Sequence, residues 1–248
     1  MKEILTGVLM MLILFCNAQN HPKFSVQMAV GPSFPAGKFA DKSLHSDTTS
    51  NPGGWAKPGL AVQLAIRYRV NKTSGITVQG GWQENHQDGS TLKESLITTY
   101  PTYHHYQVDA KTWKSGKILA GGYLIFPLPG NKIQIEPEVL AGVLKTSVPG
   151  YSYAAYNDSI RLGEPFPQNG SFSGRTLAWA FCYQAGANVN WKFNSKVFFL
   201  ASLDFFHAAP SWSYTTYPFY PSADAAVHRK NEYAIEGVNL LVGTGYRF

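Results

Sequence analysis

Charged residues are scarce in this chain, and cysteine is almost absent. Only 15% of the 248 residues are Asp, Glu, Lys or Arg, against about 25% in an average soluble domain. Two cysteines are too few for a disulfide scaffold. The chain shows neither the Gly-X-Y period of collagen nor the low hydrophobicity and high charge of a disordered protein. These shortages exclude three classes of protein and leave a folded chain with little charged surface.

Long apolar runs are also missing, except near the start. One apolar run follows Lys2 and gives way to small residues up to Ala18, which is typical of a secretory signal peptide. The run is too short for a membrane helix, which needs about 20 apolar residues. We therefore predict a signal peptide over 1–18 and a single domain over 19–248. The only cysteine of that domain, Cys182, excludes an internal disulfide.

Positive charge is in modest excess but is concentrated nowhere. There are 21 Lys and Arg residues against 15 Asp and Glu, a net charge of +6. The basic residues are scattered without a run of five or more, unlike the basic patch of a nucleic-acid-binding protein. We therefore expect no nucleic-acid partner, and we place the excess on loops near an anionic membrane surface.

What the chain does contain is alternation of apolar and polar residues. In 59–70, every second residue from Leu60 to Val70 is apolar or aromatic, while Gln63 and Arg67 lie on the opposite face. A period of two indicates β-strands with two different faces. The same test predicts eight strands, at about 23–35, 58–70, 75–85, 112–126, 132–146, 176–191, 197–208 and 234–248. Alternation is weakest in the fourth strand, where we place Lys117 opposite Ile118, Ala120, Leu124 and Phe126.

The connections between these strands alternate in length. Three are short, at 71–74, 127–131 and 192–196, and four are long, at 36–57, 86–111, 147–175 and 209–233. Loops beyond about 12 to 15 residues are uncommon in compact soluble domains. Short periplasmic turns and long extracellular loops are instead typical of bacterial outer-membrane barrels. The predicted fold is all-β: an eight-stranded antiparallel up-and-down transmembrane β-barrel with short periplasmic turns and four long extracellular loops.

Two segments resemble those of known outer-membrane proteins. The last strand alternates apolar residues up to Tyr246 and Phe248, and so resembles the assembly signal of outer-membrane β-barrel proteins. The segment 31–39, Gly-Pro-Ser-Phe-Pro-Ala-Gly-Lys-Phe, resembles the strand-to-loop passage of the small outer-membrane β-barrel domain family of Gram-negative bacteria. The resemblance covers essentially the whole domain. It implies location in the cell outer membrane, contact with outer-membrane lipid, and folding by the barrel-assembly machinery.

A soluble, lipocalin-like periplasmic ligand carrier is an alternative, because strict alternation also describes a barrel whose apolar face points inward. The aromatic residues favour the membrane barrel, since they gather where two interfacial girdles are expected. Those near the long-loop ends are Trp82, Trp179 and Phe205, and those near the short turns are Phe24, Tyr68, Phe126, Trp191 and Tyr246.

The predicted interior receives charges of both signs. These are Arg67, Arg69, Lys117, Glu136, Glu138, Asp204 and Arg247. Eight strands leave a lumen just wide enough for side chains to fill it, and buried charges are tolerated there only when paired. We interpret the set as a salt-bridge network that plugs the barrel, with an ion or proton path as the alternative.

Catalytic and metal sites find little support. Eight-stranded lipid A deacylases carry a His and a Ser two residues apart, on one face of a strand. None of the seven histidines here has a Ser at the second following position. His104 and His105 are adjacent, would point opposite ways on extended backbone, and match no zinc pattern. We expect no enzyme activity, metal or cofactor, with an outer-membrane lipid-modifying enzyme as the alternative.

Aromatic residues crowd the long loops. Candidates for surface recognition are Tyr103, Tyr106, Tyr151, Tyr153, Trp212, Tyr214, Tyr217 and Tyr220. Tyrosine combines a large rigid contact area with a hydroxyl group, which suits binding of a surface glycan or a protein. The rings could equally pack on one another and on lipid headgroups, so both interpretations stay open. The predicted function is a non-conducting outer-membrane barrel with a structural or surface-recognition role.

Overall fold

The computed structural model describes residues 23–42, 54–99, 105–149, 151–156, 168–172, 175–216 and 227–248. The predicted signal peptide lies outside these ranges and stays a prediction. The eight long strands are β1 (Phe24–Pro35), β2 (Gly59–Arg69), β3 (Ser74–His86), β5 (Thr112–Leu124), β7 (Ile133–Val148), β10 (Arg175–Lys192), β11 (Val197–Ala208) and β14 (Ile235–Arg247). All eight predicted strands are confirmed, with ends that differ by two residues or fewer.

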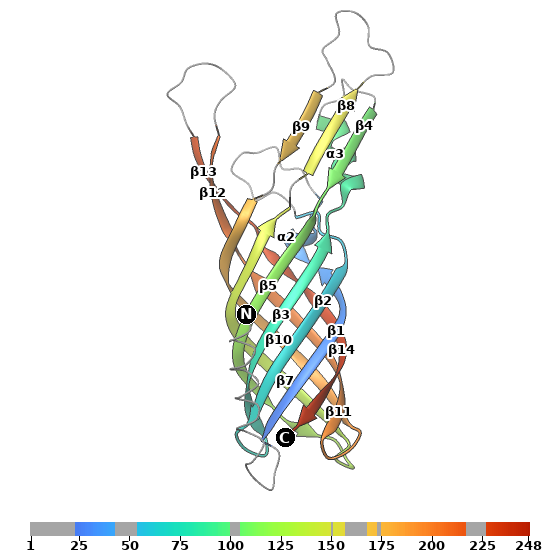
Figure 1. Cartoon of the computed structure of the whole chain (residues 1–248), viewed down its shortest axis with the longest axis vertical. Coiled ribbons are helices and arrows are strands. Elements are labelled where there is room, and N and C mark those ends of the chain that lie inside the picture. The colour runs from blue at the N-terminus through green and yellow to red at the C-terminus, as the bar shows by residue number, and fades with distance from the viewer. Residues whose placement is uncertain are drawn as a thin grey trace, which may run out of the picture.

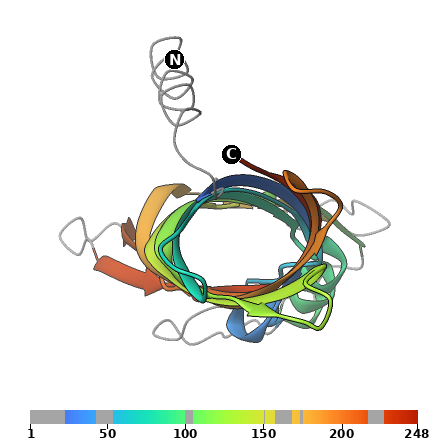
Figure 2. The ribbon, with the colours of Figure 1, turned by 90° about the horizontal axis from the view of Figure 1, so that it is seen from below.

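These strands close into one antiparallel barrel. Their order is β10-β11-β14-β1-β2-β3-β5-β7, and β10 also pairs with β7. Figure 1 shows the tilted strands from the side, and Figure 2 shows the closed ring from one end. Closure satisfies the backbone hydrogen bonds of every strand within the sheet and leaves no free edge. The predicted eight-stranded up-and-down barrel is therefore confirmed.

Asparagine side chains shape two of the short turns. In the turn after β2, Asn71 Oδ1 accepts hydrogen bonds from the backbone N–H groups of Thr73 and Ser74, both at 2.8 Å. In the turn after β10, Asn194 Oδ1 accepts from the N–H groups of Lys196 and Val197, at 2.8 and 2.7 Å. Such local bonds replace the strand ladder and reverse the chain within a few residues.

The long connections carry secondary structure of their own, which the alternation did not predict. They contain the helices α2 (Gly37–Ala40) and α3 (Gly89–Thr99) and the strands β4 (His105–Ala110), β8 (Tyr151–Tyr156), β9 (Gln168–Phe172), β12 (Ser211–Thr216) and β13 (Val227–Glu232). The remaining strand, β6 (Phe126–Pro127), continues the β5 edge at the opposite end. In Figure 1 the strands of the long connections extend beyond the long-loop end of the barrel. No helix of the described part is long and apolar enough to cross a membrane.

Glycines on the inner face make room for aromatic rings. A Cβ atom on Gly75 would lie 2.3 Å from the Tyr123 ring, and one on Gly245 would lie 2.1 Å from the Phe198 ring. Each ring therefore occupies the space beside a glycine of the neighbouring strand that a side chain would fill. Because a glycine lies beside each aromatic residue, the narrow barrel has room for these rings near its short-turn end.

Candidate functional site

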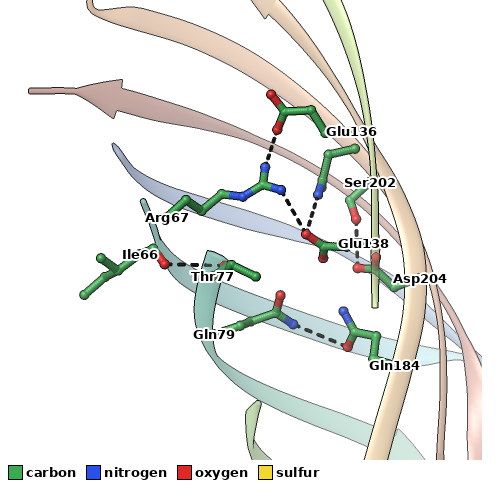
Figure 3. A network of polar contacts seen from close by, with 10 residues as sticks. Ile66, Arg67, Thr77, Gln79, Glu136, Glu138, Gln184, Ser202 and Asp204 are labelled. Atoms are coloured by element: carbon green, nitrogen blue, oxygen red, sulfur yellow. Dashed lines mark hydrogen bonds and ion pairs between the residues drawn. The ribbon is translucent and has the colours of Figure 1, made fainter. Parts of the chain in front are cut away.

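A buried ion-pair network crosses the lumen from β2 to β7. The guanidinium group of Arg67 donates through Nη1 to Glu136 and through Nη2 to Glu138, the latter at 3.1 Å. Asn188 on β10 donates from Nδ2 to the same Glu138 oxygen at 3.0 Å. Figure 3 shows the two carboxylates facing the single guanidinium. Arg67, Glu136 and Glu138 are each at most 3% exposed, so this network holds charge well away from solvent.

The remaining interior charges bind neutral partners. Lys117 Nζ donates to Gln184 Oε1 at 2.6 Å and lies 4.6 Å from the centre of the Phe206 ring. Asp204 accepts from the Ser202 hydroxyl at 2.7 Å. All five of the deeper predicted lumen charges do lie buried inside the barrel: Arg67, Lys117, Glu136, Glu138 and Asp204. The expectation that opposite charges pair throughout holds only for the Arg67 network.

Arg69 and Arg247 lie at the short-turn end of the lumen and are half-buried. Arg247 Nη2 donates to Gln134 Oε1 at 3.1 Å, and its guanidinium lies 4.7 Å from the centre of the Phe198 ring. Among the described residues, neither arginine forms an ion pair with a carboxylate. The predicted lumen residues therefore form three arrangements. One is the Arg67 ion-pair network, the second is Lys117 and Asp204 with their neutral partners, and the third is the pair of arginines at the short-turn end.

An apolar cluster fills the lumen towards the long-loop end. Trp113 on β5 packs edge-on against Phe39 of α2, with ring centres 5.4 Å apart. Trp113 Nε1 also donates to the carbonyl of Gly54 at 2.9 Å. We name this cluster the apolar seal; its buried members are Phe39, Ala56, Trp113, Leu119, Leu140, Leu144, Ala178, Cys182, Phe206, Ala208 and Ile235. Sequence reasoning missed the seal, although several of its residues lie on the same parity as the interior charges.

The short helix α2 is fastened to the first residues of β14. Ala36 N–H donates to the carbonyl of Glu236 at 3.0 Å, and Lys38 N–H donates to the Glu236 carboxylate at 3.1 Å. The second carboxylate oxygen contacts His207 Nδ1 at 3.1 Å. Gly37 has a φ of +49°, and a Cβ there would overlap Glu236, so this close approach requires glycine. The fastening holds Phe39 in the seal.

Beyond the seal, α3, β4, β8 and β9 form a separate packed unit, which we name the loop layer. Strand β8 pairs with both β4 and β9. A second small core, made of Trp55, Leu92, Leu96 and Tyr106, lies between α3 and β4. The described part of the long-loop end is thus a packed structure with its own apolar interior.

Asp88 anchors α3 to this end of the barrel. Its Oδ1 accepts from the Thr91 N–H at 3.3 Å, which caps the helix, and its carboxylate pairs with Lys42 at 2.8 Å and Lys57 at 2.9 Å. Burial raises the pKa of the Asp88 carboxyl, but the hydrogen bonds from Lys42, Ser90, Lys57 and Thr91 outweigh it and hold the pKa well below its ordinary value of 3.8. The anchor therefore keeps its charge into acidic pH.

The predicted recognition residues divide into three groups. Tyr106 is buried in the small core of the loop layer, so it packs inside the layer. Tyr151 and Tyr153 lie on β8, and Trp212 and Tyr214 lie on β12. The other three, Tyr103, Tyr217 and Tyr220, lie outside the described residues. Of the two adjacent histidines that match no zinc pattern, His104 lies outside the described residues as well, while His105 begins β4.

The predicted assembly signal lies where the last strand joins the first. Tyr246 pairs with Val26 of β1 and Val197 of β11. The Phe248 N–H donates to the carbonyl of Phe24 at 2.9 Å. The role of Tyr246 and Phe248 in assembly stays a prediction.

The outer surface of the barrel is apolar around its whole circumference. Every strand points large apolar side chains outward, for example Met28, Leu64, Val78, Ile118, Val139, Phe181, Leu203 and Val242, which are 52–68% exposed. The polar parity points inward, the reverse of a soluble lipocalin-like barrel. An apolar belt of this extent is stable only against lipid, and short turns alternate with long loops around it. The chain is an outer-membrane β-barrel.

Aromatic side chains border this membrane-facing belt at both ends, as predicted. Those exposed near the extracellular loops are Trp82, Trp179 and Phe205, and those exposed near the periplasmic turns are Phe126, Trp191 and Tyr246. Phe24 and Tyr68 stack on each other at the periplasmic end, with ring centres 4.7 Å apart. Such girdles hold a barrel at a fixed depth in the bilayer.

Leu64→Arg is expected to lower the free energy of unfolding by about 2–4 kcal/mol, the cost of Arg at the bilayer midplane of such barrels. Leu64 faces outward, near the middle of β2. The matched control is Gln63→Arg, because Gln63 faces the lumen and hydrogen-bonds there to Asp204. This second change is expected to cost less. Reversible unfolding in lipid vesicles measures both, and equal costs would contradict the assigned facing.

Known structures of similar shape are outer-membrane proteins. OprG from Pseudomonas aeruginosa matches over 92% of this chain and 96% of its own, with 13% identity and a TM-score of 0.47. Outer membrane protein W of E. coli matches over 93% and 100%, with 16% identity and a TM-score of 0.38. Ail, the attachment invasion locus protein of Yersinia pestis, matches over 91% and 99%, with 13% identity and a TM-score of 0.39. At these identities the similarity concerns the fold alone.

No protein-family model matches the chain, and no curated protein is significantly similar to it.

Proposed function

We propose that this barrel does not conduct solutes, has no catalytic role, and presents its loop layer at the cell surface to recognise a glycan or a protein. The observation that carries the proposal is the separate core of the loop layer. Its four core residues are each at most 7% exposed: Trp55, Leu92, Leu96 and Tyr106. They lie beyond the barrel, and the barrel strands close without them. An ordered surface loses little conformational entropy when it binds, which favours recognition.

The closed lumen supports the non-conducting part of the proposal. The Arg67 network crosses the lumen on the periplasmic side, and the apolar seal fills it on the extracellular side. Eight-stranded barrels enclose too little space for both a packed interior and an aqueous path. The interior is therefore a structural core that supports the surface above it.

A pair of neighbouring substitutions in α3 tests the recognition role. Leu96→Asp places a charge in the core of the loop layer, where Leu96 is 5% exposed, whereas Ile97 is 38% exposed. We expect the intact protein to bind a subset of a glycan array or of extracellular matrix proteins, Ile97→Asp to bind equally, and Leu96→Asp to lose at least tenfold in affinity. All three should keep the heat-modifiable migration of a folded barrel.

Failure of the intact protein to bind either class of ligand would contradict the recognition role, as would equal binding by Leu96→Asp. The absence of catalysis is tested separately by incubating the purified barrel with lipid A. Mass spectrometry is expected to show neither gain nor loss of an acyl chain.

A further inference from the structure

Four cationic side chains converge at the periplasmic mouth of the barrel. Arg247 and Arg67 lie on either side of Ser25 in the strand order β14-β1-β2. The Arg69 N–H donates to the Lys23 carbonyl at 2.8 Å, which brings these two residues together at the same rim. A small cavity of about 20 Å³ lies among them. Its other lining residues are Phe24, Ser25, Tyr123, Glu136, Asn190 and Phe198.

The charges around this cavity do not balance. Four cations and one carboxylate, Glu136, line the cavity. Arg67 pairs with Glu136 and also with Glu138, so four cations against two carboxylates leave a surplus of two positive charges. Within the described ranges, no ion pair is found for Lys23, Arg69 or Arg247. Like charges held together at the edge of a low-dielectric interior repel one another unless an anion joins them.

A second observation also points to an anionic ligand. The Arg67 side chain is 98% buried and lines the cavity. Its Nε–H group has no hydrogen-bond partner. Buried donors are almost always hydrogen-bonded, to protein, water or ligand. An arginine has no acceptor of its own, so only an acceptor from outside this residue satisfies the group.

We propose that the periplasmic mouth binds a phosphate group. Guanidinium groups match phosphate oxygens with paired, charge-assisted hydrogen bonds, and three cations without an ion pair in the described structure suit a group with several anionic oxygens. The cavity has room for about one water-sized atom group, so one phosphate oxygen enters it while the others remain at the open mouth. The phosphate belongs either to an anionic phospholipid headgroup of the periplasmic leaflet, in which no choline or amine neutralises it, or to a soluble phosphate compound.

The test uses thermal unfolding of the full-length protein, because a ligand that binds only the folded state raises the unfolding temperature. In uncharged maltoside micelles, inorganic phosphate is compared with sodium chloride at equal ionic strength. In a parallel arm, vesicles of phosphatidylglycerol mixed with phosphatidylcholine are compared with phosphatidylcholine alone. A rise with inorganic phosphate assigns a soluble ligand, a rise confined to the phosphatidylglycerol vesicles assigns the headgroup, and either supports the site.

Arg69→Gln is the decisive variant, because Arg69 has no ion pair in the described structure that its loss would break. It is expected to fold at least as stably as the original protein without phosphate, and to need at least tenfold more ligand for the same rise in unfolding temperature. The matched control is Lys114→Gln, which removes one positive charge at the extracellular end, where Lys114 lies 4.0 Å from Glu84. This control should respond like the original protein.

Two results would overturn the proposal. One is that neither phosphate source raises the unfolding temperature above its chloride or phosphatidylcholine reference. The other is that Arg69→Gln responds as strongly as the original protein. If Arg69→Gln fails to fold, Arg247→Gln replaces it with the same expected outcomes.

Discussion

Arg67→Ala is expected to lower the free energy of unfolding of the barrel by about 3–5 kcal/mol, because removing one partner of a buried ion pair leaves the other charge without compensation. Glu136 and Glu138 would then share a lumen from which the one cation that pairs with them in the described structure has been removed. Reversible guanidinium unfolding in phospholipid vesicles measures the change. A loss below about 1 kcal/mol, the size of an exposed ion pair, would contradict the assigned burial of the network.

Two controls separate charge from volume in this experiment. Arg69→Ala removes an arginine two residues further along β2 that has no ion pair within the described structure, and it should change stability by less than about 1 kcal/mol. Arg67→Met combined with Glu136→Gln and Glu138→Gln removes the charges together. Replacing all members of a buried network costs less than breaking it, so the triple variant should recover most of the loss.

Trp113→Ala is expected to cost a similar amount, about 3–5 kcal/mol, as for other buried aromatic residues truncated to alanine. The substitution leaves a cavity beside Phe39 and removes the hydrogen bond to the Gly54 carbonyl. It should also loosen the hold on α2, and limited proteolysis between Phe39 and Gly54 would detect this. The same unfolding assay gives the energy.

Trp179→Ala is the comparison for this prediction, since Trp179 is 62% exposed on the outer face of β10. It loses contacts with lipid but leaves no internal cavity, so its cost should be clearly smaller. If Trp113→Ala costs no more than Trp179→Ala, the apolar seal does not stabilise the barrel.

The barrel strands could be predicted from sequence because their physics is local and repeated. A strand between lipid and lumen needs an apolar face and a polar face. The alternation of Leu64 with Gln63 and Arg67 therefore predicts both the strand and which of its faces points to lipid. Even the weak pattern around Lys117 was assigned correctly, with Ile118 exposed outside and Lys117 buried inside. The length of each connection also predicts which end of the barrel faces the periplasm.

The features above and within the lumen depend on contacts between distant parts of the chain, which alternation does not report. The apolar seal brings Phe39, from a long connection, onto Trp113 of another strand. The partner of Lys117 is an amide of Gln184, 67 positions away, where charge matching alone suggested a carboxylate. Helix α3 could have been recognised from Asp88 as a capping residue, since Asp before a helical segment is a known start signal.

Planar lipid bilayer recordings of the purified full-length protein test the central claim most directly, that the lumen is closed by the Arg67 network and by the apolar seal. The account predicts no stable unitary conductance for the intact protein. It predicts none for Trp113→Ala either, because the ion-pair network still crosses the lumen. Reproducible conductance steps of constant size from the intact protein would contradict the closed lumen and assign the barrel a transport role.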